Sequence, residues 1–150
     1  MSLMPAFKYA EELLGELLLK DWARMGQKKP IVLLVDDDDV FRTTLRTLLE
    51  QDASFDFCVE ARSGTEAIGR ARHFVPDLAI LDFFLPEMNG LQLAQELREI
   101  VPRLPIFLVT ADRDLHAEKE ALSCGIDAVF SKIEDLQTLL ANARVACGIK

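Results

Sequence analysis

Apolar and polar positions alternate along the chain in a way that predicts strands and helices in turn. From residue 31 onward, short runs of almost entirely apolar residues are typical of strands buried on both faces of a parallel sheet. Segments in which apolar residues recur every three or four positions separate these runs and predict amphipathic helices. We expect strands at 31–35, 55–60, 78–81, 106–109 and 128–130. We expect helices at 40–49, 91–100, 113–123 and 134–147, and one after Ser63, which has the capping-box partner Glu66.

The alternation of strands and helices predicts an α/β fold. Five strand–helix units within residues 31–147 are too few for an eight-unit barrel, so an open doubly wound parallel sheet is the natural arrangement. Ligands of such sheets bind at the carboxyl ends of the strands. The residues that follow each strand are therefore the first candidates for a functional site.

A separate amphipathic helix is predicted at 5–25, before the first strand. Its apolar positions lie three or four residues apart, and a polar linker from Gly26 to Pro30 ends it. We therefore divide the chain into an N-terminal helix and linker at 1–29 and one domain at 30–150. A helix of about 20 residues is marginal alone in water, so its apolar face must pack on something. Its own domain and a second copy of the chain are both open as partners, and we favour a homodimer.

The charge and composition narrow the class of protein. The net charge is −8, which disfavours binding of nucleic acid or of an anionic membrane through bulk electrostatics. No apolar run approaches the roughly 20 residues needed to cross a bilayer. The three cysteines, Cys58, Cys124 and Cys147, form no CxxC pair, which indicates reduced core thiols. We expect a cytoplasmic protein.

Polar residues with useful chemistry follow four of the predicted strands. Asp36 and Asp37 follow the first strand, Asp82 the third, Thr110 the fourth and Lys132 the fifth. Because parallel strands end at the same edge of the sheet, we expect these side chains to meet there. Two carboxylates about 4 Å apart repel by roughly 1 kcal/mol in water and roughly 4 kcal/mol at an effective dielectric of 20. Such a cluster calls for a cation, and ligands that are all oxygen favour Mg²⁺.

This group of residues fits the transfer of a phosphoryl group. The carboxylate of Asp82 can act as a nucleophile and form an aspartyl phosphate. The hydroxyl of Thr110 and the ammonium of Lys132 can stabilise the negative charge of the transferring group. The two remaining acids, Asp38 and Asp39, are better explained as caps of the following helix, a position that favours aspartate.

The sequence resembles the receiver domains of two-component response regulators over residues 31–147. The most specific segment runs from Asp82 to Gly90, with a proline four residues and a glycine eight residues after the acid. The other matching segments are the apolar strand ending in Asp36-Asp37, then Val109-Thr110-Ala111, and then Ser131-Lys132. The resemblance implies a flavodoxin-like fold, with a parallel sheet of strand order 2-1-3-4-5 and an added N-terminal helix.

The resemblance also implies a function. Asp82 would take a phosphoryl group from a histidine of a sensor kinase or phosphotransfer protein, and Thr110 and Lys132 would contact the phosphoryl oxygens. Such a domain is not an enzyme in the usual sense, since it only takes up and hydrolyses its own phosphoryl group. The ligands of Mg²⁺ would be Asp36, Asp37, Asp82 and the backbone carbonyl of Phe84.

Three features depart from the family pattern. Ile133 follows the lysine where the family has a proline in a cis peptide, and a non-proline cis bond costs about 3 kcal/mol, so this turn should be rearranged. Val129 stands where the family has an aromatic residue that moves with the threonine, and Phe130 lies next to it. The chain ends at Lys150 without an output domain, which fits either a free-standing receiver or one trimmed from a longer protein.

Two other functions are open. The residues from Asp36 to Val40 fit the signature of haloacid-dehalogenase-type phosphatases, with Asp36 as nucleophile and Asp38 as general acid. The segment from Asp82 to Gly90 would then be unexplained, and no second acidic pair follows a later strand. The chain could also be a receiver-like binding module that is never phosphorylated, although every residue needed for phosphorylation is present.

Overall fold

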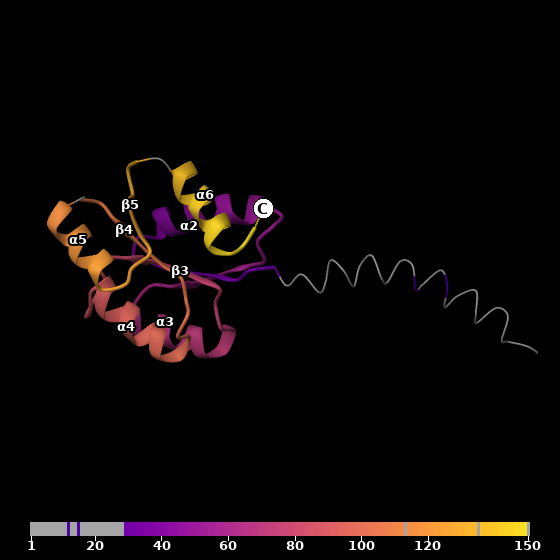
Figure 1. Cartoon of the computed structure of the whole chain (residues 1–150), viewed down its shortest axis with the longest axis horizontal. Coiled ribbons are helices and arrows are strands. Elements are labelled where there is room, and N and C mark those ends of the chain that lie inside the picture. The colour runs from indigo at the N-terminus through magenta and orange to yellow at the C-terminus, as the bar shows by residue number, and fades with distance from the viewer. Residues whose placement is uncertain (1–11, 13–14, 16–28, 113, 135, 150) are drawn as a thin grey trace, which may run out of the picture.

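A computed structural model describes residues 12, 15, 29–112, 114–134 and 136–149. Within these residues, five strands alternate with five helices (Figure 1). The strands are β1 (Val32–Val35), β2 (Cys58–Ala61), β3 (Leu78–Asp82), β4 (Ile106–Thr110) and β5 (Ala128–Ser131). The helices are α2 (Asp39–Gln51), α3 (Gly64–Phe74), α4 (Gly90–Ile100), α5 (Leu115–Ser123) and α6 (Leu136–Ala146).

The strands form one parallel sheet in the order β2-β1-β3-β4-β5, as expected. Helices cover both of its faces (Figure 1). One face packs on α3, α4 and α5 through residues such as Leu93 and Leu97. The other packs on α2 and α6 through residues such as Leu45 and Leu139. The sheet is therefore doubly wound, and β1, β3 and β4 are buried along their whole length.

The registers of the strands bring their carboxyl ends to one edge of the sheet. Val35 at the end of β1 pairs with Leu81, so Asp36 and Asp82 each follow a paired position. On the next strand Asp82 pairs with Val109, and Thr110 pairs with Ser131 beyond it. The residues expected to carry the chemistry consequently lie at the ends of four neighbouring strands, β1, β3, β4 and β5.

The start of α3 differs in part from the expected capping pattern. Ser63 caps α3, because its hydroxyl accepts a hydrogen bond from Glu66 N at 3.2 Å. The Glu66 carboxylate instead accepts a hydrogen bond from Arg70 one turn later, so the expected reciprocal box is only half formed. A complete capping box is present at α4, where Asn89 and Gln92 bond to each other's backbone N–H.

Several expected boundaries are shifted. The second strand begins at Cys58 and not at residue 55, because Phe55 is part of a turn that bonds its N–H to Asp52 O. Phe55 is nevertheless buried, so its apolar character reflects its packing in the core on the α2 and α6 face and not a place in the strand. The fifth helix begins at Leu115, since Asp114 accepts a hydrogen bond from His116 N and caps it there. The last helix is shorter than expected at both of its ends.

Two other expectations fall outside the described part or need correction. The helix predicted at 5–25 lies outside the described residues, apart from residues 12 and 15, which are helical. Cys58 and Cys147 are half-buried, but Cys124 is exposed, so the expectation of three core thiols is wrong at that position. None of the helices in the described ranges is long and apolar enough to cross a membrane.

Candidate functional site

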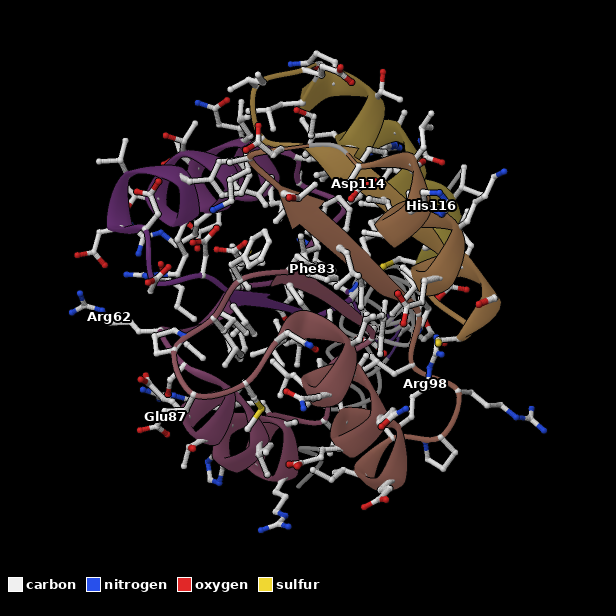
Figure 2. All side chains as sticks on the ribbon, turned by 90° about the vertical axis from the view of Figure 1, so that its left-hand side faces the viewer. Arg62, Phe83, Glu87, Arg98, Asp114 and His116 are labelled. Atoms are coloured by element: carbon white, nitrogen blue, oxygen red, sulfur yellow. The ribbon has the colours of Figure 1, made fainter. Side chains whose placement is uncertain are left out.

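The residues chosen from the sequence lie at the carboxyl edge of the sheet, at or just after the ends of β1, β3, β4 and β5. Figure 2 views the molecule from the side of this edge. In that view Phe83, which follows β3, lies near the centre, with Arg62 and Glu87 to one side and Asp114 to the other. Asp36 and Asp82 come from the two central strands and are 3% and 6% exposed. Thr110, at the end of β4, is 7% exposed. The sequence therefore places polar groups where the sheet is otherwise apolar.

Three carboxylates form a compact acidic cluster. Asp36, Asp37 and Asp82 each offer an oxygen within 4.8 Å of the oxygens of the other two. Asp36 Oδ1 accepts a hydrogen bond from Asp38 N at 2.8 Å. Asp36 Oδ2 is buried, and its close polar contact is the Lys132 ammonium at 2.6 Å, without good hydrogen-bond geometry. Three clustered carboxylates beside a single ammonium form a donor set that suits a hard cation such as Mg²⁺.

The ammonium of Lys132 lies between the two buried acids. Its Nζ is 2.6 Å from Asp36 Oδ2 and 3.1 Å from Asp82 Oδ2. It also lies 4.9 Å from the centroid of the Phe41 ring, a cation–π contact. Burial acts to lower the pKa of Lys132, but the two carboxylates raise it above its usual value. Lys132 is therefore a fixed positive charge at the acidic cluster.

Asp82 has an unusual protonation equilibrium. Burial, reinforced by the charge of Asp36, raises its pKa to about 6. Hydrogen bonds from Lys132 and from Phe84 N act in the opposite direction. A carboxylate that is costly to ionise in the folded protein gains from any cation or covalent group that disperses its charge.

A close packing contact holds the loop after β3. Gly90 N donates to Phe83 O at 2.8 Å, and the Cα of Gly90 lies against the end of the strand. A Cβ at Gly90 would lie 2.8 Å from Asp82 O and 2.9 Å from a methyl group of Leu108. The glycine eight residues after the acid is thus required by space, which accounts physically for this part of the Asp82 to Gly90 segment.

The two departures from the expected pattern both have structural consequences. The Lys132–Ile133 peptide is not cis, and Ile133 N donates to Ser131 Oγ at 3.3 Å, so the turn differs from one with a cis-proline. Val129 packs in the core on the α3, α4 and α5 face, whereas Phe130 packs against the tilted ring of Phe107 on the opposite face. Phe130 therefore cannot take the place of an aromatic ring at position 129.

A cavity of about 310 Å³ lies beside Thr110, and Val129 and Leu108 form part of its wall. The Thr110 hydroxyl donates to Asp112 O at 3.0 Å and is thus bonded to its own loop. The exposed ring of Phe84 lines the same cavity. A side chain larger than valine at position 129 would extend into this space.

The other two acids of the run have structural roles. Asp38 caps α2, since its Oδ1 accepts hydrogen bonds from Val40 N and Phe41 N. Asp39 forms ion pairs with Arg42 and Arg62. The expected capping role is confirmed for Asp38, whereas Asp39 is the first residue of α2 and binds arginines instead of capping the helix. Oδ1 of Asp38, the residue that a phosphatase would need as general acid, is thus engaged by the helix.

Sequence reasoning missed one residue next to the site. Arg42, on the first turn of α2, donates to the backbone oxygen of Asp36 at 2.6 Å. It also binds Asp39 and Glu60. The only signal in the sequence is an arginine six residues after the first acid, and a surface arginine on a helix has the same appearance.

Comparison with known proteins identifies the family. The family model described as response regulator receiver domain matches residues 32–144. Response regulator MprA of Mycobacterium sp. (strain KMS) is 36% identical over 115 residues, covering 75% of this chain and 48% of its own length. Chemotaxis protein CheY of Halobacterium salinarum is 32% identical over 101 residues, covering 67% and 82%.

A solved structure has the same architecture. The signal receiver domain of the putative response regulator NarL from Mycobacterium tuberculosis superposes with a TM-score of 0.71 at 26% identity, covering 80% of this chain and 98% of that one. The chain spans about half the length of several curated relatives, among them MprA. The matched residues include all of the strands and the acidic cluster at their ends. The chain therefore belongs to the family of response regulator receiver domains.

Proposed function

We propose that Asp82 is the phosphoryl acceptor of this receiver domain. The observation that carries the proposal is the position of its carboxylate, which is buried between a fixed ammonium on Lys132 and the acidic pair Asp36 and Asp37. A buried carboxylate with a raised pKa, a neighbouring cation and a set of metal ligands is what an aspartyl phosphate requires.

The proposed transfer is a substitution at phosphorus. An oxygen of the Asp82 carboxylate forms a bond to the phosphorus atom while the bond from phosphorus to the donor nitrogen breaks. The electron pair stays on the imidazole nitrogen of the donor histidine, which then takes up a proton. With acetyl phosphate as donor, acetate leaves instead. Lys132 would follow the negative charge from the carboxylate to the phosphoryl oxygens, since its Nζ already touches both acids.

The metal fits the acidic cluster. Asp36, Asp37 and Asp82 would hold Mg²⁺ together with the backbone carbonyl of Phe84, whose N–H is already bonded to Asp82 Oδ1. When bound, Mg²⁺ supplies positive charge that offsets the repulsion among the carboxylates and that of an incoming phosphoryl group. Thr110 would donate its hydroxyl to a phosphoryl oxygen after releasing Asp112 O.

The surface around the cluster suits a protein donor. Val40, Phe84 and Ile133, which follow β1, β3 and β5, are 77%, 65% and 85% exposed. These apolar side chains surround the carboxyl edge, where a donor histidine has to approach. A helix of a histidine kinase or phosphotransfer protein that carries the histidine beside apolar residues would bury them. A cytoplasmic location is part of the same proposal, because such donors present their histidine there.

Intact-mass analysis after reaction with acetyl phosphate tests the proposal. The protein should gain the mass of one phosphoryl group with Mg²⁺ present and none with EDTA, and hydroxylamine should remove it. Asp82→Asn should abolish the gain, whereas Asp38→Asn should retain it, because asparagine also caps helices. If the unaltered protein gains no mass, it is an unphosphorylated binding module and the proposal is wrong.

A further inference from the structure

Arg42 joins three elements around the acidic cluster. Its Nη1 donates to Asp36 O at 2.6 Å, its Nε to Glu60 on β2 at 3.0 Å, and its Nη2 to Asp39 at 2.6 Å. The Arg42 side chain is 10% exposed, so its bonds to Asp36 O and Glu60 are partly shielded from water, whereas the Asp39 carboxylate is 57% exposed. One planar guanidinium thus fixes the end of β1, the first turn of α2 and the neighbouring strand relative to each other.

The neighbouring arginines do not share this arrangement. Arg46, one turn further along α2, binds the other oxygen of Glu60 at 2.6 Å, and among the described residues it forms no hydrogen bond or ion pair with the loop after β1. Its side chain is 37% exposed. Arg62 reaches Asp39 at 3.2 Å and is 62% exposed. Of these three arginines, Arg42 is the one whose guanidinium contacts the backbone of a residue in the acidic cluster.

The contact lies where a small displacement matters. Asp36 is held by its N–H, which donates to Ala61 O, by its carboxylate, which accepts from Asp38 N, and by its carbonyl, which accepts from Arg42. This carbonyl belongs to the peptide bond that joins Asp36 to Asp37. Mg²⁺ demands nearly ideal octahedral geometry, with ligands about 2.0–2.1 Å away, so a shift of a few tenths of an ångström in this peptide weakens binding.

We propose that Arg42 is a positioning residue, which sets the backbone of Asp36 and Asp37 and thereby the affinity of the acidic cluster for Mg²⁺. The inference rests on the proposed function, since it takes these acids as the metal ligands. Arg42 acts through the peptide and does not touch the metal or the phosphoryl group.

A purely electrostatic role for Arg42 predicts the opposite effect. A cation close to a metal site repels the metal, so its removal would strengthen Mg²⁺ binding. A lysine keeps the charge but cannot bond to three acceptors in one plane. For Arg42→Gln, the two roles therefore predict changes of opposite sign in the affinity for Mg²⁺. For Arg42→Lys, they predict changes of different size.

The test is a calorimetric titration of the full chain with MgCl₂ at constant ionic strength. Both Arg42→Gln and Arg42→Lys should raise the dissociation constant about tenfold, as is typical of residues that orient metal ligands. Arg46→Gln is the matched control, because it loses an ion pair to the same Glu60, and it should stay within about twofold. The melting temperature of each variant is measured beside it.

Each outcome decides the question. A larger dissociation constant for Mg²⁺ in both Arg42 variants, with that of Arg46→Gln unchanged, supports the positioning role even where all three variants lose stability. Tighter binding by Arg42→Gln, or equal binding by Arg42→Lys and the unaltered protein, overturns it. If the Arg42 variants do not fold, Glu60→Gln removes one anchor of the guanidinium and should weaken Mg²⁺ binding more than Arg46→Gln does. If the unaltered protein itself binds no Mg²⁺, the proposed function fails, and this result is distinct from the others.

Discussion

The carboxylate of Asp82 is ionised at neutral pH against two opposing forces. Burial and the charge of Asp36 raise its pKa to about 6, whereas Lys132 acts to lower it. A folded-state pKa above the usual 3.8 means that the folded protein binds this proton more tightly than the unfolded chain. The stabilising effect of the proton is complete below the unfolded pKa and is lost as the pH rises through about 6. At pH 7 without metal, the charge therefore destabilises the fold.

Replacing this carboxylate should consequently stabilise the metal-free protein. Asp82→Asn should raise the free energy of unfolding at pH 7 by about 1–3 kcal/mol, and the gain should shrink as the pH falls towards 4. Denaturant titrations in EDTA at several pH values measure it, with the exposed Asp56→Asn as control. A loss of stability at pH 7 would show that the ion pair with Lys132 outweighs the repulsion from Asp36.

Phe84 should govern how long the phosphoryl group lasts. Its side chain is two residues after the acceptor, is 65% exposed and packs edge-on against Phe83 at 4.9 Å between ring centroids. A phenyl ring cannot orient a water molecule for attack, whereas an amide can. Phe84→Asn should lose the phosphoryl group faster than the unaltered protein in a timed intact-mass assay. Phe57→Asn, which alters an exposed ring outside the site, should not, and an unchanged rate for Phe84→Asn would refute the shielding role.

At the scale of single elements, the sequence was most informative where a strand is buried on both faces. The strands β1, β3 and β4 lie within one residue of the expected ranges, because their apolar runs have no solvent face to blur the pattern. β2 at the edge of the sheet was misplaced, since Phe55 is buried without being in the strand. The same clear apolar runs also showed where each strand ends, and therefore which polar residues follow it.

Contacts between elements were harder to predict. The box at Asn89 and Gln92 has the same spacing as Ser63 and Glu66, and local spacing alone does not show that Glu66 prefers Arg70. The role of Arg42 depends on Glu60, which is 18 residues away and adjacent only after the sheet forms. Long-range pairing of this kind has no periodic signal in the sequence.

The start of helix α2 separates Asp37, a proposed Mg²⁺ ligand, from Asp39, which pairs with arginines. Asp37 precedes the helix and belongs to the acidic cluster, whereas Asp39 is its first residue and pairs with Arg42 and Arg62. Asp37→Ala should therefore weaken Mg²⁺ binding more than Asp39→Ala does. Titration calorimetry of both variants decides this, and equal losses would mean that the wrong acids have been chosen.

At the scale of the whole molecule, the order of the strands explains why distant residues form one site. β1 and β3 are adjacent in the sheet, as the pairing of Val32 with Leu78 shows. In the sequence, however, Leu78 at the start of β3 comes 42 positions after Asp36. Periodicity predicted the number and type of elements, but the order 2-1-3-4-5 came from the family resemblance. Sheet order depends on how helices pack across it, which local patterns do not encode.

We expect the association state to depend on the helix predicted at 5–25. The apolar face predicted at 5–25 has to be covered, and we expect a second copy of the chain to cover it. Sedimentation should show a dimer for the full chain and a monomer for a shortened chain beginning at Lys28. If both sediment as monomers, the predicted helix packs on its own domain instead.

The site of phosphorylation tests the central claim most directly. Protein treated with acetyl phosphate and Mg²⁺ can be reduced with borohydride, which converts an aspartyl phosphate to homoserine, and then digested for peptide mass analysis. The account predicts homoserine at position 82 and at no other aspartate. Homoserine at position 36 would contradict it and would support the phosphatase chemistry in which Asp36 is the nucleophile.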